Sequence, residues 1–335
     1  MTDQPADAVP AQADALASAR ARRGPLTWTV RVVAVAGLAV PAWAAVTSWG
    51  AVIHGYPLYA ILLLATVAGS AVVGIRTLRS QHRRAGWRRV GRVVLIVGSI
   101  VWIALMAWLR PFTAVEPALA AMISDAKVTV SETPTQIVMT PAGDASTTGV
   151  FFQSGAKVEA RAYAAVLRPL AEAGYTVVIP KQPLGIAFLA MGTFDSAKSH
   201  YPTVTSWVLA GHSLGGTVAS MQADSGDTDP ASPVVGLLLY ASYPASDIST
   251  SLTATVLSVS GSNDGLATPA DIAASKANLP TGAAFTVIDG AVHAFFGDYG
   301  PQPGDGTPAI SHEDARQQIS DASVGFVRSL DGHHT

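Results

Sequence analysis

Residues 207–223 read WVLAGHSLGGTVASMQA and contain the pattern Gly-x-Ser-x-Gly from Gly211 to Gly215. The apolar residues before this pattern favour a strand, and the Ala-containing stretch after it favours a helix. A serine on such a strand-to-helix turn exposes its hydroxyl, and small flanking residues let the two backbones pass closely. The helix that follows directs its free N–H groups towards any nearby anion. The stretch therefore predicts that Ser213 is a nucleophile.

The sequence around this turn alternates short β-branched runs with Ala-rich helical periods. The pattern predicts strands at 150–153, 175–180, 207–210, 234–240, 254–260 and 283–288, and helices at 158–173, 184–198, 214–223, 270–277 and 312–330. Such alternation is typical of parallel strands that are joined by helical crossovers. We therefore expect an α/β fold with a mostly parallel, doubly wound sheet over residues 128–331.

Two further residues follow predicted strands and can complete a site with Ser213. Asp264 lies in the turn SGSNDG, and His293 lies in the loop GAVHAFFGDYG. Open α/β sheets bind their ligands at the carboxyl ends of the strands, where both residues would lie. A neutral imidazole there can take the serine proton and return it to a leaving group if a carboxylate fixes its tautomer.

Other residues have weaker positions. Asp289 is the rival acid, but it lies four residues before His293, where the last strand is expected to end. The remaining histidines considered lie beside the nucleophile, at the ends of helices or in the C-terminal tail: His212, His200, His312, His333 and His334. The structural alternative for Asp264 is a solvated turn, because Asn-Asp-Gly forms turns by itself.

Five blocks of the sequence resemble the α/β-hydrolase family, over roughly residues 129–329: GVFFQSGAKVEARAY, GYTVVIPKQPLGIAFL, GHSLGG, SGSNDGLAT and VHAFFGDYGPQPGDG. The similarity is greatest to a compact, lid-poor, dienelactone-hydrolase-like branch. The family carries its nucleophile, acid and base in the chain order Ser, Asp, His, which Ser213, Asp264 and His293 match.

The resemblance also implies an oxyanion hole. Its backbone N–H donors would be Leu214, directly after the nucleophile, and Ala156, in the turn after strand 150–153. Ser154 stands in that turn where the family usually has His or Pro. The second donor is therefore less well defined than the turn itself.

The first third of the chain differs in composition from the rest. Residues 1–110 contain twelve Arg, no Lys and three Asp, a charge of +9, against −11 for the remainder. Uncharged apolar runs predict three membrane spans, at about 32–49, 58–75 and 93–109, within an anchor over 27–110. A buried core helix is the alternative for any single run, and a cleavable signal peptide for the first. Three runs with Arg clusters between them favour the anchor.

The Arg residues also predict an orientation. They lie before the first span and in the loop between the second and third spans, whereas the loop between the first two has none. The positive-inside rule then places an N-terminal tail, 1–26, and the Arg-rich loop in the cytoplasm. Three spans place a tether at 111–127, the domain at 128–331 and a short tail at 332–335 outside it. We expect a multi-pass protein of the cell membrane.

Several functional classes are excluded by what the sequence lacks. It has no Cys, and therefore no disulfide framework, thiolate metal site or Cys nucleophile. No metalloprotease, dinucleotide-binding or P-loop motif is present, so neither a metal nor a cofactor is expected. The Arg-rich loop lies between two spans, where topology and lipid headgroups account for it, so membrane lipids and not nucleic acids are the expected partners.

The sequence thus predicts a membrane-anchored, extracytoplasmic serine hydrolase, similar to a carboxylesterase or lipase. It would cleave an ester or related acyl bond of a small-molecule or lipid-like substrate through an acyl-enzyme. Acyl transfer to a cell-envelope acceptor uses the same residues and stays open. A non-catalytic membrane scaffold is the alternative from a different class, and the intact Ser, Asp, His order counts against it. Neither the substrate nor the oligomeric state follows from the sequence.

Overall fold

The computed structural model describes residues 25–79 and 87–331. The described chain forms two compact units, named here the helical unit and the sheet unit. The helical unit contains residues 25–47, 60–79 and 87–110, and the sheet unit contains residues 48–59 and 111–331.

The helical unit contains α2 (Pro25–Thr47), α5 (Trp87–Trp108) and, from Ala60 onwards, α4 (Pro57–Arg79). Each is long and apolar enough to cross a membrane. The Trp102 indole N–H of α5 donates to the Thr66 hydroxyl of α4 at 2.9 Å. The three predicted apolar spans are therefore helices of membrane-spanning length, with bounds shifted by several residues. Their sidedness stays a prediction, and most of the tail 1–26 and part of the Arg-rich loop lie outside the described residues.

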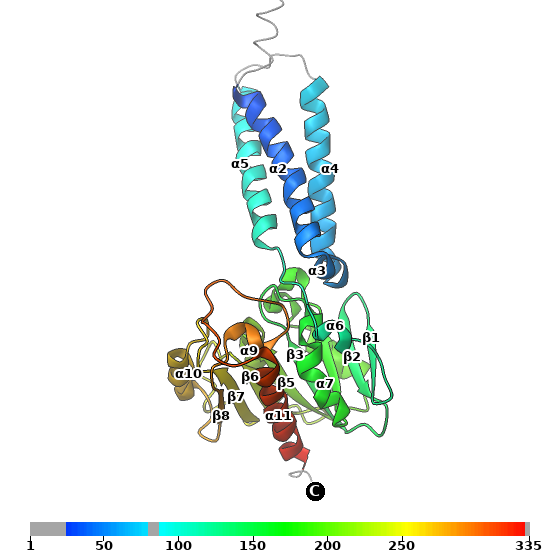
Figure 1. Cartoon of the computed structure of the whole chain (residues 1–335), viewed down its shortest axis with the longest axis vertical. Coiled ribbons are helices and arrows are strands. Elements are labelled where there is room, and N and C mark those ends of the chain that lie inside the picture. Colours follow the sequence, from blue (N-terminus) through cyan, green and yellow to red (C-terminus); the bar gives the residue numbers. More distant parts are fainter. Residues whose placement is uncertain (1–24, 80–86, 332–335) are drawn as a thin grey trace, which may run out of the picture. The chain divides into compact units, whose positions relative to one another are not determined.

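The sheet unit is built on eight strands in the order β1-β2-β4-β3-β5-β6-β7-β8 (Figure 1). An antiparallel hairpin, β1 (Val128–Glu132) and β2 (Gln136–Pro141), forms one edge, and β2 is also antiparallel to β4. The other strand pairs are parallel. These strands are β3 (Thr148–Gln153), β4 (Thr176–Pro180), β5 (Ser206–His212), β6 (Val234–Tyr240), β7 (Thr255–Gly261) and β8 (Ala284–Ile288). The predicted mostly parallel sheet is confirmed, whereas the hairpin was not predicted.

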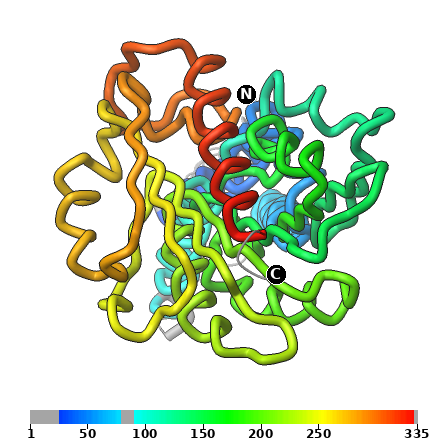
Figure 2. Tube along the Cα trace, turned by 90° about the horizontal axis from the view of Figure 1, so that it is seen from below, coloured from blue at the N-terminus to red at the C-terminus, as the bar shows by residue number. Residues whose placement is uncertain are grey.

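Helices cover both faces of the sheet, as expected of a doubly wound fold. On one face α7 (Ala164–Glu172) and α11 (His312–Asp331) lie side by side, joined by a 2.9 Å hydrogen bond from the Ser320 hydroxyl to the Val166 carbonyl (Figures 1 and 2). The other face is covered by α8 (Thr193–His200) and α9 (Leu214–Gly226), whose apolar residues pack around buried Trp207. A shorter helix, α10 (Pro269–Ser275), contacts β7.

Two segments differ from expectation. Residues 111–127, expected as a tether, contain α6 (Ala118–Ala121) and pack on the sheet unit, where Ala114 and Ala118 are buried in the core. Residues 184–198 do not form one helix. They form two 3-10 turns, Pro183–Gly185 and Ala187–Ala190, before α8 begins. Leu184 has a φ of 55°, which interrupts any helix at this point.

Candidate functional site

The turns after β3 and β5 meet where the strand order of the sheet reverses. Gln153 of β3 pairs with Gly211 of β5, so both turns lie at the same sheet edge, where open α/β sheets bind ligands. Ser213 follows β5 directly and precedes α9. Its φ of 51° and ψ of −126° are rarely adopted by a residue with a side chain. Strain on a strand-to-helix turn is typical of a nucleophile elbow.

The glycines around Ser213 are required by close backbone contacts. A Cβ on Gly211 would lie 2.5 Å from the carbonyl carbon of Gly215, and one on Gly215 would lie 2.2 Å from the Gln153 carbonyl oxygen. A larger residue at Gly215 would force the elbow away from the end of β3, and one at Gly211 would force the end of β5 away from the first turn of α9. The beginning of α9 is therefore in direct contact with the turn after β3.

Asp264 and His293 form a buried pair beyond β7 and β8. The distance from His293 Nδ1 to Asp264 Oδ2 is 2.9 Å. The other carboxylate oxygen, Oδ1, accepts the N–H groups of Leu266 and Ala267, both at 2.8 Å, which fixes the orientation of the acid. A carboxylate beside Nδ1 holds the proton there and leaves Nε2 to accept one. His293 Nε2 is buried and has no hydrogen-bond partner among the described residues.

Ser213 is brought close to this pair through its neighbour His212. The ring centroids of His212 and His293 are 4.5 Å apart. Within the described residues, no hydrogen bond joins the Ser213 hydroxyl to His293. Catalytic hydrogen bonds are often long in a protein without substrate and tighten when substrate binds. The three residues predicted from sequence thus follow β5, β7 and β8 at one edge of the sheet.

Asp289, the rival acid, is engaged elsewhere. It is exposed, and its Oδ1 accepts the Ser262 hydroxyl at 2.9 Å. In the part of the chain that the structure describes, it makes no contact with His293. The geometry therefore favours Asp264 as the partner of the imidazole.

The turn after β3 leaves the expected oxyanion donor available. The Gly155 N–H donates to the Tyr163 hydroxyl at 2.9 Å, and the Lys157 N–H donates to the Gly185 carbonyl at 2.7 Å. Between them, the Ala156 N–H donates to no acceptor among the described residues, and the same holds for the Leu214 N–H at the start of α9. Both N–H groups that the sequence resemblance implies are therefore free to bind an anion.

A buried Tyr163–His212 pair links this turn to the elbow, and no sequence motif predicts it. The Tyr163 hydroxyl is 2.8 Å from His212 Nδ1. The same oxygen accepts the Gly155 N–H, and its own proton is available to an unprotonated Nδ1. Burial, together with the nearby His293, lowers the pKa of His212 well below its ordinary value, so the ring is neutral. The pair therefore adds no positive charge beside the proposed base.

Asp305, in the Pro- and Gly-rich run 300–306, is a further residue of the candidate site that no sequence motif predicts. Its carboxylate accepts the N–H groups of His293 at 3.0 Å, Ala294 at 2.8 Å and Gly265 at 3.2 Å. One side chain thus joins the turn that carries the acid to the loop that carries the base.

We expect Asp305→Ala to lower kcat by up to about 10²-fold, because a shift of about 1 Å in a catalytic group can cost that much. KM should change little, since the carboxylate binds backbone N–H groups of the enzyme itself. The measurement is steady-state ester hydrolysis. Asp247→Ala is the matched control, because this exposed aspartate also accepts a backbone N–H, from Ser249 at 2.9 Å. An unchanged kcat in the folded Asp305→Ala protein would remove Asp305 from the site.

The remaining histidines lie away from this arrangement. His200 is exposed at the end of α8, where its Nδ1 lies 2.7 Å from the Ser196 carbonyl. The His312 ring stacks on Phe295 at the start of α11, with centroids 4.4 Å apart. His333 and His334 lie outside the described residues. Within 25–79 and 87–331, no group of three or more His, Cys, Asp or Glu side chains could hold a metal ion.

Comparison with known proteins identifies one matching family. The model of a family described as the alpha/beta hydrolase family matches residues 149–317, half of the chain. No curated protein matches the sequence. The dienelactone-hydrolase-like branch is not addressed by the match and stays a prediction.

Three similar solved structures share low sequence identity with this chain. Est1E from Butyrivibrio proteoclasticus is 13% identical, with a TM-score of 0.45, over 62% of this chain and 99% of that one. The esterase domain of a Rhodothermus marinus protein is 16% identical, with a TM-score of 0.43, over 58% and 92% of the two chains. The Paleococcus ferrophilus monoacylglycerol lipase is 15% identical, with a TM-score of 0.42, over 55% and 96%.

Proposed function

The chain belongs to the alpha/beta hydrolase family, and on this premise we propose that it is a membrane-anchored serine hydrolase that cleaves an ester or related acyl bond. The observation that supports the proposal is a strained serine, Ser213, whose neighbour His212 has its ring centroid 4.5 Å from that of His293 in the buried Asp264–His293 pair. A carboxylesterase-like or lipase-like activity uses this set of groups without a metal or cofactor.

In the proposed mechanism, the Ser213 hydroxyl attacks the acyl carbonyl while His293 Nε2 accepts its proton. Asp264 stabilises the imidazolium, and the Ala156 and Leu214 N–H groups bind the oxyanion that forms. Collapse of the tetrahedral intermediate expels the alcohol, which takes the proton back from His293, and leaves the acyl group on Ser213. Water then attacks the acyl-enzyme with the same proton transfers and releases the carboxylic acid.

The experiment that tests this proposal treats the full-length protein, in detergent micelles, with a fluorophosphonate probe and then with p-nitrophenyl esters of increasing chain length. Covalent labelling and ester turnover support the proposal. A folded protein that shows neither would favour a non-catalytic scaffold. Adding an alcohol acceptor separates hydrolysis from acyl transfer, because the first yields free acid and the second yields a new ester.

The sidedness proposed from the Arg residues can be tested separately, because the chain has no Cys. Ala145→Cys, at an exposed position between β2 and β3, should react with a membrane-impermeant maleimide on intact cells. Ser80→Cys, in the Arg-rich loop and outside the described residues, should react only after lysis. Labelling of Ser80→Cys alone on intact cells would reverse the proposed topology.

A further inference from the structure

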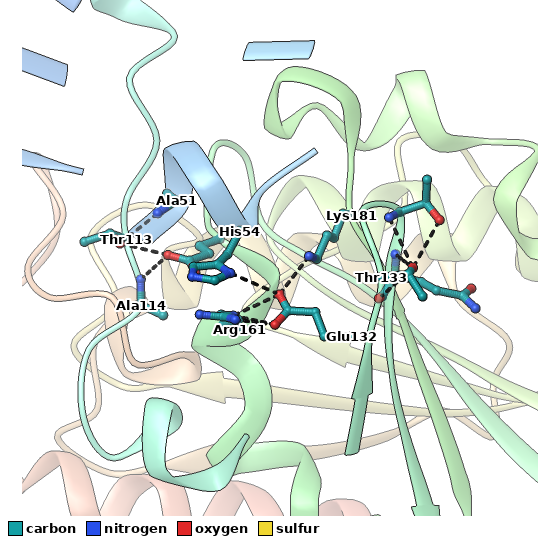
Figure 3. Close-up of polar contacts among 11 residues, drawn as sticks. Ala51, His54, Thr113, Ala114, Glu132, Thr133, Arg161 and Lys181 are labelled. Carbon is teal, nitrogen blue, oxygen red and sulfur yellow. Dashed lines mark hydrogen bonds and ion pairs between the residues drawn. The ribbon is translucent and has the colours of Figure 1, made fainter. Parts of the chain in front are cut away.

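The loop between the first two membrane spans contributes a helix to the sheet unit. This helix, α3 (Trp49–His54), belongs to a stretch, Ser48–Tyr59, that groups with the strands and not with the long helices. The Ala51 N–H at its first turn donates to the Thr113 hydroxyl at 3.2 Å (Figure 3). The Ser48 hydroxyl, just before α3, donates to the Pro111 carbonyl at 2.9 Å. The helix is therefore bound to the residues that follow the third span.

Thr113 connects α3 to a buried carboxylate. The same hydroxyl that accepts the Ala51 N–H donates to Glu159 Oε2 at 2.8 Å, and the Ala114 N–H donates to that oxygen at 2.8 Å. Glu159 is only 4% exposed. The contact is closely fitted, because a Cβ on Gly50 would lie 2.7 Å from the Thr113 hydroxyl oxygen.

Glu159 lies three residues after the proposed oxyanion donor Ala156. The Phe112 N–H donates to the Lys157 carbonyl at 2.8 Å, and the Glu159 N–H donates to the Phe112 carbonyl at 3.0 Å. The segment 111–114, which binds α3, therefore forms backbone hydrogen bonds with the residues directly after Ala156. On the other side of Ala156, Tyr163 holds the Gly155 N–H.

Glu132 provides a second link between α3 and this region. Its carboxylate accepts the Arg161 Nε–H at 2.9 Å and the Lys181 ammonium at 2.7 Å, and His54 of α3 lies 3.9 Å away (Figure 3). Arg161 belongs to the same 3-10 turn as Tyr163. Both links from α3 thus reach the segment 154–163 that contains the proposed donor and its supporting tyrosine.

We propose that α3 is a positioning element of the hydrolase, which holds the Ala156 N–H towards the oxyanion through Thr113 and Glu159. The inference rests on the proposed acyl-enzyme mechanism and adds that the loop between the first two spans is needed for the full rate. An oxyanion donor acts on charge that develops only in the transition state. Loss of its position therefore lowers kcat and leaves KM nearly unchanged. A smaller folded fraction would also lower the apparent kcat, but it would leave the affinity for an inhibitor that forms an oxyanion unchanged.

The first test is Thr113→Val in the full-length protein. We expect kcat to fall about 10-fold or more with KM within about twofold, and the affinity for a trifluoromethyl ketone inhibitor, which forms an oxyanion, to fall in proportion. Thr113→Ser keeps the hydroxyl and should keep most of the activity. Thr129→Val is the matched control, because it makes the same change at an exposed position on β1.

A second variant carries its substitution in α3 itself and leaves every residue after the third span unchanged. Gly50→Val should push α3 away from Thr113 and lower kcat as Thr113→Val does. Its control is Gly143→Val, where a Cβ would meet nothing within 4 Å. A wild-type kcat in Gly50→Val, or an equal loss in Gly143→Val, overturns the inference even if Thr113→Val fails to fold. The proposed function fails separately, when the wild-type protein shows neither ester turnover nor labelling at Ser213.

Discussion

Ser213→Ala should abolish fluorophosphonate labelling and lower kcat for ester hydrolysis by about 10⁶-fold, the loss expected when a serine nucleophile is removed. Alanine keeps the Cβ, so the elbow should keep its backbone and the protein its melting temperature. Any residual rate would come from binding and oxyanion stabilisation alone. The two measurements are fluorescence of the labelled band after gel electrophoresis and steady-state hydrolysis of a p-nitrophenyl ester.

His293→Ala should lower kcat nearly as much as Ser213→Ala does, because a nucleophile and its base act as a unit. Ser246→Ala, at an exposed serine of the same unit, is the matched control and should label and turn over as the wild type does. Labelling that persists in Ser213→Ala would place the reactive serine elsewhere and remove the proposed mechanism.

The central part of the fold could be predicted from sequence because its strands are buried on both faces. β6 is a run of apolar residues, and its predicted and observed bounds, 234–240, are the same. The edge hairpin of β1 and β2 was harder to predict. In β1 only Val128 is buried. This strand is short and partly polar, so its sequence gives a weak strand pattern. The packing of 111–127 depends on Phe112 meeting Val158, a contact between distant residues that no local pattern reveals.

The candidate site was predictable to the extent that its residues directly follow strands. Ser213, Asp264 and His293 each lie just after a predicted strand, and parallel strands bring such positions to one edge. Tyr163 and His212 are 49 residues apart, and neither lies in a motif that names its partner. Asp305 acts through backbone N–H groups, which carry no sequence signal. The α3 contact could not be foreseen either, since the sequence predicted only a short loop without Arg between the first two spans.

Asp264→Asn is expected to preserve the fold and lower kcat by up to about 10⁴-fold. The reason lies in how the two carboxylate oxygens are used. Oδ1 accepts the Leu266 and Ala267 N–H groups, so the amide oxygen of asparagine takes this place and its NH₂ group faces His293. The NH₂ group donates to Nδ1, which moves the imidazole proton to Nε2. His293 can then no longer accept the proton of Ser213.

Asp289→Asn makes the same chemical change in an exposed residue that contacts Ser262, and it should alter kcat by less than about twofold. The rate of fluorophosphonate labelling then distinguishes loss of the acid, in Asp264→Asn, from loss of the nucleophile, in Ser213→Ala. Asp264→Asn should label slowly but completely, because Ser213 is still present, whereas Ser213→Ala should not label at any time. A near-wild-type rate in Asp264→Asn together with a large loss in Asp289→Asn would reassign the acid, and the nucleophile would stand.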